Sequence, residues 1–441
     1  MRAPIYDFVK KYADSGSIRA HMPGHKGRSR LGAEELDITE IRGAESLYDA
    51  VGIIRESEEN AEALFGARTV YSAEGSSLSI RGMLATAVRY AASRGRKPVI
   101  LAARNVHKSF VYGAGLLDIG VEWIYGDSYL ACEISEDELI RRIDEVEPIA
   151  VYITTPDYLG NMADVRKIAD ICHERGVLLL VDSAHGSYLR FLKDSLYPTD
   201  LGADMCVSSA HKTLPVLTGG GYLHVSESAP RELWEYARSS MELFGSTSPS
   251  FLILQSLDIC NVELASGYSE RIAAFAERIA DAKRKLNTGG YLLAGEEPLK
   301  ITVLAKEYGY LGTELAALVE KLGISPEFSD RDHLVLMLTP DIRDGELSKI
   351  VDALLGIERR TPITSRPPIP AVSREAMSLR AALLSPFETV PVSNSVGRIL
   401  ATASVGCPPA VPIAISGEVI DERVRDAFLY YGIDRVSVVK E

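Results

Sequence analysis

The chain has 441 residues, of which 46% are hydrophobic and 25% are charged, as in an average soluble globular protein. These fractions exclude a disordered or collagen-like chain, and no apolar run reaches the roughly 18 residues that a membrane-spanning helix needs. The 48 basic and 61 acidic residues give a net charge of −13, which disfavours a surface that binds duplex nucleic acid. The length predicts about two or three domains.

The cysteines and the N-terminal residues bear on the cellular compartment. None of the five cysteines belongs to a C-x-x-C pair, so neither a disulfide framework nor a zinc site is expected. The first residues become polar too early for a secretory signal. We therefore expect a cytoplasmic protein without a metal ion and without membrane association.

Strands and helices alternate between about residues 57 and 225. A short helix is expected at 57–66, followed by strands at 68–72, 98–102, 121–125, 149–154, 177–182 and 204–208. Helices are expected at 76–93 and 164–175, and Ser135 and Glu138 form a capping box at the start of another. Near-continuous apolar strands that alternate with helices predict an α/β fold, with a mostly parallel sheet covered by helices on both faces.

The pattern of the remaining residues predicts a long helical region and a smaller α+β domain. The helical pattern covers 251–286 and stops at a Gly-Gly turn. Strands near 301–305 and 333–339 and helices near 313–322 and 345–355 suggest the α+β domain, and four prolines mark 359–370 as a linker. The predicted domains are an N-terminal arm (1–56), a large domain (57–288), a small α+β domain (289–358) and a C-terminal segment (359–441).

Candidate functional residues follow the predicted strands, because ligands of an open parallel sheet bind at the carboxyl ends of its strands. Gly75, Ser76 and Ser77 open a helix and could bind a phosphate through backbone amides and hydroxyl groups. Taken alone, this segment is more often a serine-capped turn. His107 follows the next strand and could stack on an aromatic ligand, although a single loop histidine is more often a surface or capping residue.

Two further positions belong together chemically. Asp182 ends a strongly apolar strand, where its carboxylate needs a cation or hydrogen-bond donors to offset the loss of water. Lys212 follows the next strand and could form an imine with a carbonyl compound. A Schiff-base lysine with an acidic partner for a pyridinium nitrogen is the minimal constellation for pyridoxal phosphate. Their joint occurrence favours that cofactor over a capping aspartate and a solvated lysine.

These and other segments resemble the bacterial ornithine/lysine/arginine decarboxylases, pyridoxal-phosphate enzymes of fold type I. The matching segments follow the family's order from the start of the chain to its last part. They are His21-Met22-Pro23-Gly24-His25-Lys26-Gly27, Asp37-Ile38-Thr39-Glu40, Gly75-Ser76-Ser77, His107-Lys108-Ser109, Asp182-x-Ala184-His185-Gly186, Ser209-x-His211-Lys212-Thr213-Leu214-Pro215, Thr247-Ser248-Pro249-Ser250, Ser256-Leu257-Asp258 and Ser395-Val396-Gly397-Arg398-Ile399.

The resemblance implies a role for most of the matching residues. Lys212 would form the imine with pyridoxal 5'-phosphate, Asp182 would pair with the ring nitrogen and His107 would stack on the ring. Thr247 or Ser248 would reach the phosphate of a neighbouring protomer, so the resemblance implies a homodimer or a higher homo-oligomer. The other implied cofactor contacts are Gly75, Ser76, Ser77, Ala184, His185, Ser209 and His211, with the precise role of His185 left open.

The chain departs from the family pattern in several places. Glu74 stands where asparagine is usual, and Gly219-Gly220-Gly221 replaces Gln-Gly-Ala. Two late motifs read Cys407-Pro408-Pro409-Ala410 and Ser416-Gly417-Glu418 in place of Tyr-Pro-Pro-Gly and Pro-Gly-Glu. These changes concern mainly the substrate pocket and the C-terminal segment. The chain is further expected to be a short form without an N-terminal regulator-like domain, with the arm 1–56 bordering the active-site entrance.

The function implied is that of a lyase, a carboxy-lyase that converts arginine, lysine or ornithine into the corresponding amine, a polyamine precursor, and carbon dioxide. An acidic side chain would pair with the distal cation of the substrate, and Glu418 is one candidate. Alternatives are a pyridoxal-phosphate-dependent aminotransferase or other amino-acid lyase, and a catalytically silent decarboxylase-like binding protein. An aminotransferase usually has an arginine that binds the substrate carboxylate, and Lys212 with Asp182 argues against a silent protein.

Overall fold

The computed structural model describes residues 1–125, 134–368, 372–407 and 411–440. The chain divides by internal packing into two compact units. The first contains residues 1–99, 148–152 and 164–271, and the second contains 100–147, 153–163 and 272–441. Within the described parts of the chain, no helix has both the length and the apolar composition needed to cross a membrane.

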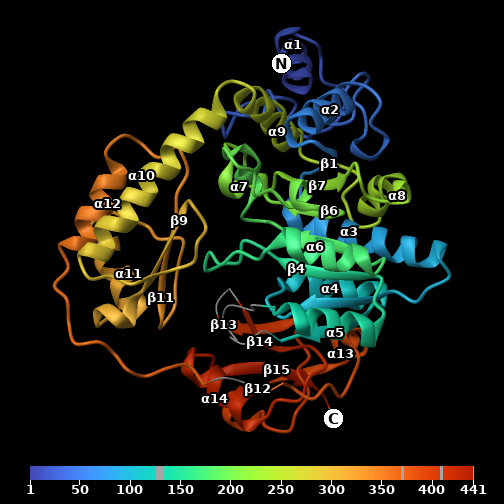
Figure 1. Cartoon of the computed structure of the whole chain (residues 1–441). Helices are drawn as coiled ribbons and strands as arrows, with labels where there is room; N and C mark the ends of the chain where they lie inside the picture. Colours follow the sequence, from blue (N-terminus) through green and yellow to red (C-terminus); the bar gives the residue numbers. More distant parts are fainter. Residues whose placement is uncertain (126–133, 369–371, 408–410, 441) are drawn as a thin grey trace. The chain divides into compact units, whose positions relative to one another are not determined.

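One seven-stranded sheet has the strand order β1-β7-β6-β5-β4-β2-β3 (Figure 1). Its strands are β1 (Ala67–Ser72), β2 (Val99–Ala103), β3 (Gly120–Ile124), β4 (Ala150–Thr154), β5 (Leu178–Asp182), β6 (Met205–Ser208) and β7 (Gly221–Ser226). The α/β class and a mostly parallel sheet are confirmed, and six of the seven strands coincide with predicted ones. The seventh, β7, was not predicted, and it runs antiparallel to both β1 and β6.

Helices of the first unit pack on this sheet and on one another. α3 packs against β6, β7 and α8, while α2 packs against β1 and α9. The small residues of α3, among them Gly82 and Ala85, let it approach its neighbours closely. The helical elements of this unit are α1 (Pro4–Asp14), η1 (Leu47–Asp49), α2 (Ile53–Phe65), α3 (Gly75–Ser93), α6 (Val165–Glu174), η2 (Ser187–Phe191), η3 (Pro198–Leu201), α7 (Ala210–Thr213), α8 (Arg231–Glu242) and α9 (Phe251–Leu264).

The long helical region predicted over 251–286 contains two helices. α9 ends at Leu264, and α10 (Tyr268–Thr288) begins after Gly267, which has a φ of +81°. A positive φ is incompatible with a continuous right-handed helix and is easily adopted only by glycine. The region is helical as predicted, and the apolar pattern, which continues across Gly267, did not reveal the break.

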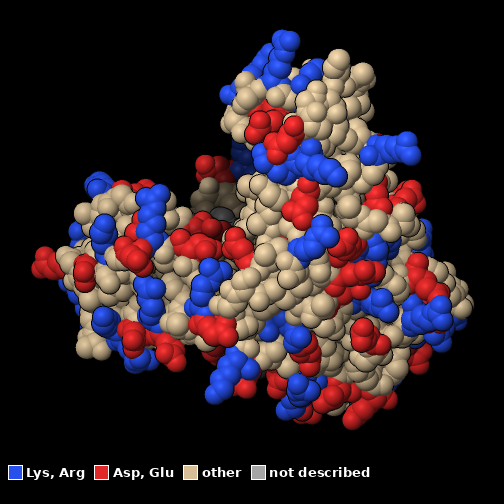
Figure 2. All heavy atoms as spheres, turned by 90° about the horizontal axis from the view of Figure 1, so that it is seen from above, with Lys and Arg blue, Asp and Glu red and all other residues tan. Residues whose placement is uncertain are grey.

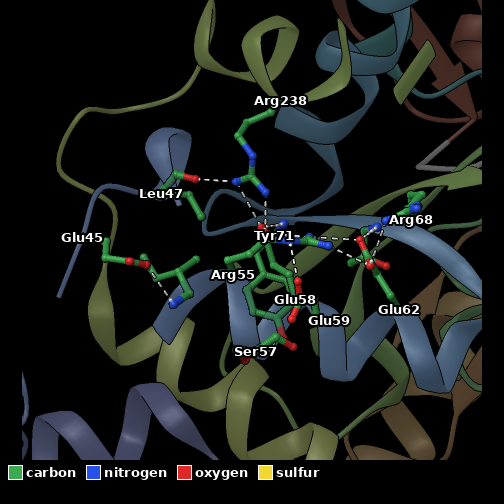
Figure 3. Close-up of polar contacts among 12 residues, drawn as sticks. Glu45, Leu47, Arg55, Ser57, Glu58, Glu59, Glu62, Arg68, Tyr71 and Arg238 are labelled. Atoms are coloured by element: carbon green, nitrogen blue, oxygen red, sulfur yellow. Dashed lines mark hydrogen bonds and ion pairs between the residues drawn. The ribbon is translucent and has the colours of Figure 1, made fainter. Parts of the chain in front are cut away.

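A buried charge network holds α2 in the first unit (Figure 3). The Glu58 carboxylate is fully buried, forms an ion pair with Arg238 of α8 and accepts a hydrogen bond from the Tyr71 amide of β1. Arg55 lies 3.6 Å from the same carboxylate, and Arg238 also donates to the Leu47 carbonyl. The network therefore links α2 to β1, α8 and η1.

The second unit contains β2 and β3 with two helices, an α+β part and a C-terminal part. In the α+β part, helices accompany a four-stranded sheet of order β10-β11-β9-β8, and the C-terminal part has two two-stranded sheets. Residues such as Leu400, Ile413 and Phe428 form the C-terminal core. The elements are α4 (Lys108–Leu117), α5 (Glu136–Val146), β8 (Leu293–Ala294), β9 (Lys300–Leu304), η4 (Ala305–Tyr308), α11 (Gly312–Glu320), β10 (Phe328–Ser329), β11 (His333–Met337), α12 (Glu346–Leu355), α13 (Leu379–Leu384), β12 (Phe387–Pro391), η5 (Val392–Asn394), β13 (Ser404–Cys407), β14 (Val411–Ile415), α14 (Glu422–Tyr430) and β15 (Arg435–Val439).

Acidic and basic side chains are mixed over the molecular face that Figure 2 shows. On the part of that face formed by described residues, no broad basic area stands out, whereas nucleic-acid-binding surfaces are usually basic. This face therefore gives no support to nucleic-acid binding.

Candidate active site

Lys212 and Asp182 lie near the carboxyl ends of two parallel neighbouring strands of the first unit. Asp182 is the last residue of β5 and pairs in register with Val207 of β6. Beyond the end of β6, Lys212 lies in the four-residue helix α7. Its Nζ atom is 2.9 Å from Nε2 of His185, in the loop that follows β5. The structure thus brings together the predicted lysine and a histidine whose role the sequence left open.

Asp182 is a buried carboxylate at the end of β5. Its side chain accepts hydrogen bonds from the Ala184 amide at 3.1 Å and from the Tyr152 hydroxyl at 3.3 Å. Burial raises the pKa of Asp182, and the charge of Lys212 and the two hydrogen bonds oppose that rise. An acid of this kind is suited to pair with a protonated ring nitrogen.

Tyr152 was missed by the sequence analysis. It lies within the apolar strand β4, and its hydroxyl reaches the end of β5. A tyrosine in an apolar run is ordinarily a core residue, so its sequence position gave no signal of this contact.

The N-terminus of α3 lies against the segment around α7 and forms with it a candidate cradle for a phosphate. Gly75 has a φ of +66° and donates its amide hydrogen to the Gly219 carbonyl at 2.6 Å. Ser209 donates to Ser76 through their hydroxyl groups at 2.8 Å. Nδ1 of His211 lies 2.8 Å from the Gly220 carbonyl, and burial lowers the pKa of His211. A 19-residue helix whose first turn carries serines provides the amides, hydroxyls and positive potential that bind a phosphate.

Gly221 explains part of the departure from the family pattern. A Cβ atom at this position would lie 2.9 Å from the Ser208 carbonyl oxygen and 3.1 Å from the Gly75 carbonyl carbon. β7 therefore approaches β6 and the start of α3 too closely for any side chain at residue 221. Glycine here keeps the cradle intact.

Glu74 has a partner that accounts for its presence before α3. Its carboxylate accepts a hydrogen bond from the Ser246 amide at 2.7 Å. Ser246 directly precedes Thr247 and Ser248, which are both exposed. Glu74 thus anchors the segment whose hydroxyl groups are predicted to reach a neighbouring protomer, and that reach stays a prediction.

The remaining predicted residues belong to the second unit. His107 is the N-cap of α4, where its Nδ1 atom accepts a hydrogen bond from the Ser109 amide at 3.2 Å, and its ring is exposed. Glu418, the candidate for binding the distal cation, instead forms a buried ion pair with Arg104. Residues 408–410 of the other late motif lie outside the described residues.

The side chains of the first unit fit pyridoxal phosphate. The group needs an anion site for its phosphate, an amine for its aldehyde and an acid for its ring nitrogen. The start of α3, Lys212 and Asp182 supply these three functions. In addition, the hydroxyl groups of Ser183 and Thr213 are buried without a hydrogen-bond partner among the described residues, which leaves donors available next to Asp182 and Lys212 in the chain.

Comparison with known proteins identifies the family of the chain. Residues 3–298 match the family described as Orn/Lys/Arg decarboxylase, major domain. The chain belongs to the Orn/Lys/Arg decarboxylase family. It is a pyridoxal-phosphate-dependent amino-acid decarboxylase of fold type I, as the resemblance implied.

Similar proteins cover nearly the whole chain. It is 29% identical to an arginine decarboxylase of Halalkalibacterium halodurans, over 96% of this chain and 91% of that protein. An arginine decarboxylase of Bacillus subtilis is 28% identical over 95% and 91% of the two chains. Among solved structures, a lysine decarboxylase of Francisella novicida has a TM-score of 0.79 at 16% identity, covering 100% of this chain and 81% of that one. That structural likeness shows the fold, and it leaves the substrate open.

Proposed function

We propose that the protein decarboxylates a basic L-amino acid to its amine and carbon dioxide, with L-arginine as the first candidate substrate. The observation that carries the proposal is the contact of Lys212 with His185, close to the buried Asp182, at the strand ends of a chain of this family. L-Arginine comes first because two relatives that cover about 95% of the chain are named arginine decarboxylases. L-Lysine and L-ornithine are the other candidates.

Each of the site residues in the first unit has a role in the proposed reaction. When bound, pyridoxal phosphate supplies an electron sink for the negative charge that remains on the substrate Cα after carbon dioxide leaves. The buried carboxylate of Asp182, which accepts hydrogen bonds from the Tyr152 hydroxyl and the Ala184 amide, holds a proton at the ring nitrogen. Ser76, Ser209 and the first amides of α3 bind the phosphate.

Lys212 and His185 handle protons at the reacting end. Nε2 of His185 lies 2.9 Å from Nζ of Lys212, within the distance for direct proton transfer. The pair can therefore share a proton, which keeps the amine available to bond with the cofactor. The same pair can return a proton to the substrate Cα after decarboxylation.

The proposal is tested with the purified protein loaded with pyridoxal phosphate. We expect an absorption band of the lysine-bound cofactor, and release of carbon dioxide and the matching amine from L-arginine, L-lysine or L-ornithine. Lys212→Ala should abolish both the band and turnover. A wild-type protein that shows the band but releases no carbon dioxide from any of the three amino acids would contradict the proposed substrate class.

A further inference from the structure

The turn that leads from β1 into α3 is held by one buried hydroxyl group. Ser72 is the last residue of β1 and is fully buried. Its hydroxyl donates to the Gly75 carbonyl at 2.8 Å and accepts a hydrogen bond from the Glu74 amide at 3.2 Å. A single side chain in the sheet therefore binds both the residue before α3 and the first residue of that helix.

The residue before α3 does not hold the start of the helix with its own side chain. Glu74 is the N-cap, but among the described residues its side chain makes no capping hydrogen bond. Its carboxylate accepts a hydrogen bond from the Ser246 amide instead. The next residue is Gly75, which has a φ of +66° and, as a glycine, has a wide choice of backbone conformations. The contacts of the Ser72 hydroxyl limit that choice.

The bond to the Gly75 carbonyl also sets the direction of the next amide. A peptide group is planar and trans, so its C=O and N–H bonds point in opposite directions. Because the Gly75 oxygen is turned toward Ser72, the N–H of Ser76 points the other way, out of the start of α3 and into the cradle. Amides in this position bind anions at the N-terminus of a helix.

The neighbouring strand leaves the turn little room. Ser72 pairs in register with Gly221, the first residue of β7. A Cβ atom at Gly221 would lie 3.1 Å from the Gly75 carbonyl carbon and 3.3 Å from the Ser76 amide nitrogen. The peptide group between Gly75 and Ser76 is therefore enclosed between the Ser72 hydroxyl and the backbone of β7. Both contacts favour one orientation of this peptide group.

We propose that Ser72 is a positioning residue for the phosphate of the cofactor. Its hydroxyl acts through the Gly75 carbonyl and directs the N–H of Ser76 into the cradle. The proposal rests on the assignment of the phosphate to the start of α3, and it does not depend on which amino acid the enzyme decarboxylates. Ser72 should therefore contribute to binding of the phosphate group and not to binding of the ring or the aldehyde.

The test compares how the cofactor-free chain binds pyridoxal phosphate and pyridoxal, which has the same ring and aldehyde but no phosphate. The absorption band of the lysine-bound compound follows both titrations. We expect Ser72→Ala to raise the dissociation constant of pyridoxal phosphate about 5- to 20-fold, because a hydrogen bond to a charged group becomes poorly aligned. The dissociation constant of pyridoxal should stay nearly unchanged. Ser72→Cys keeps the volume of the side chain but is a weak donor, so it should show the same selective loss.

Two further variants serve as controls. The Ser76 hydroxyl belongs to the cradle, so Ser76→Ala should weaken binding of pyridoxal phosphate selectively. Thr69 is another fully buried residue of β1, and its hydroxyl donates to the Ala67 carbonyl at 3.0 Å. Thr69→Val removes a buried hydroxyl from the same strand and should leave both dissociation constants unchanged.

The controls separate the ways in which the proposal can fail. If Ser76→Ala is selective but Ser72→Ala raises both dissociation constants equally, or neither, then Ser72 does not position the phosphate site. If Ser76→Ala also shows no selectivity, the phosphate does not bind at the start of α3, and the proposed role of Ser72 is overturned together with that assignment. No substrate is used, so these results stand even if the enzyme fails to decarboxylate the proposed amino acids.

Discussion

Asp182 is a buried carboxylate whose pKa depends on opposing influences of its surroundings. Burial raises its pKa, while Lys212, the Ala184 amide and the Tyr152 hydroxyl lower it. A cofactor whose ring nitrogen must stay protonated needs the charged form of this acid. Each donor around Asp182 therefore contributes to the reaction without touching the substrate.

Tyr152→Phe should slow the enzyme by about three- to tenfold at neutral pH, the usual effect of one hydrogen bond. Loss of the hydroxyl raises the pKa of Asp182 further, because one stabilising contact of the carboxylate disappears. The acidic limb of the kcat profile should therefore move to higher pH. The measurement is kcat and the cofactor absorption band as functions of pH.

Tyr222→Phe is the control for that substitution. Tyr222 lies fully buried in β7 of the same sheet, and its hydroxyl has no hydrogen-bond partner among the described residues. Its removal should leave the pH profile unchanged. Equal displacement of the profile in both variants would show that Tyr152 acts only through packing.

Sequence reasoning found the residues whose position along the chain reveals their task. Asp182 and Lys212 follow strands, so the rule for ligands of parallel sheets identifies them. Tyr152 and Arg104 could not be found in this way. Tyr152 contacts a carboxylate 30 residues away, and Arg104 contacts one 314 residues away, and only the folded chain brings these atoms together.

At the scale of elements, α2 depends on the charge network of Glu58 (Figure 3). Arg238→Met removes the cation that pairs closely with this fully buried carboxylate and leaves Arg55 at 3.6 Å. We expect the free energy of unfolding to fall by about 3–5 kcal/mol, since breaking a buried pair leaves an uncompensated charge. Urea unfolding followed by circular dichroism measures the change.

The same helix offers the matched control. Arg231 also lies on α8, and its 2.8 Å ion pair with Glu235 is largely exposed, with 88% of the Arg231 side chain accessible. Arg231→Met should change the unfolding midpoint only slightly, because water screens exposed pairs. A loss of stability as large as that of Arg238→Met would mean that helix propensity, and not the buried pair, is what α8 loses.

The contribution of Asp258, which binds the start of α1, to the stability of the protein should depend on pH. Asp258 of α9 is buried and accepts hydrogen bonds from the first amides of α1, at Ile5 and Tyr6, and from the Ser57 hydroxyl. Burial raises the pKa of Asp258 from its ordinary value near 3.8 to about 6, and these hydrogen bonds oppose the rise. Between about pH 4 and pH 6 the folded state therefore binds more protons than the unfolded state, and this group's contribution to stability falls as the pH rises.

Asp258→Asn removes that titration. As the pH rises from 4 to 7, the free energy of unfolding of the variant should increase relative to that of wild type by about 2–3 kcal/mol. This is the free energy equivalent of the pKa shift of Asp258. Urea unfolding of both proteins at the two pH values measures the difference. A constant difference between variant and wild type would show that Asp258 does not titrate in this range.

Elements themselves were predictable where a single periodic pattern decides them. Strands such as β2, β4 and β5 are nearly continuous apolar runs, and both the predicted and the observed strands follow those runs. β7 was overlooked because the three glycines at 219–221 are typical of a turn. Gly221 instead begins β7, where the backbone of Ser208 and Gly75 lies too close for a side chain. The break between α9 and α10 was overlooked because one glycine does not interrupt the apolar pattern.

At the scale of the whole molecule, the prediction to be tested is association of protomers. The fold type I decarboxylase family is typically dimeric, and we propose that this protein is a homodimer whose active sites are shared. The exposed hydroxyl groups of Thr247 and Ser248, held in place through Glu74 and the Ser246 amide, are the groups expected to reach the partner's phosphate. Sedimentation analysis should show a dimer, and Thr247→Val/Ser248→Ala should weaken cofactor binding about tenfold, as loss of hydrogen bonds to a charged group does.

Mixing Lys212→Ala, which is expected to be inactive, with the variant of weakened cofactor binding tests whether sites are shared. A dimer of Lys212→Ala with Thr247→Val/Ser248→Ala contains one site that lacks both functions and one site that is intact. After random exchange of subunits in a symmetric dimer, about a quarter of all sites are native, so the mixture should recover about a quarter of the wild-type activity at limiting cofactor. If every site is built from one chain alone, mixing restores nothing beyond the average of the two variants. Recovery of activity therefore requires that hydroxyl groups of one protomer act at the lysine of the other. If a proven dimer recovers no activity, Thr247 and Ser248 act in the site of their own chain or in no site.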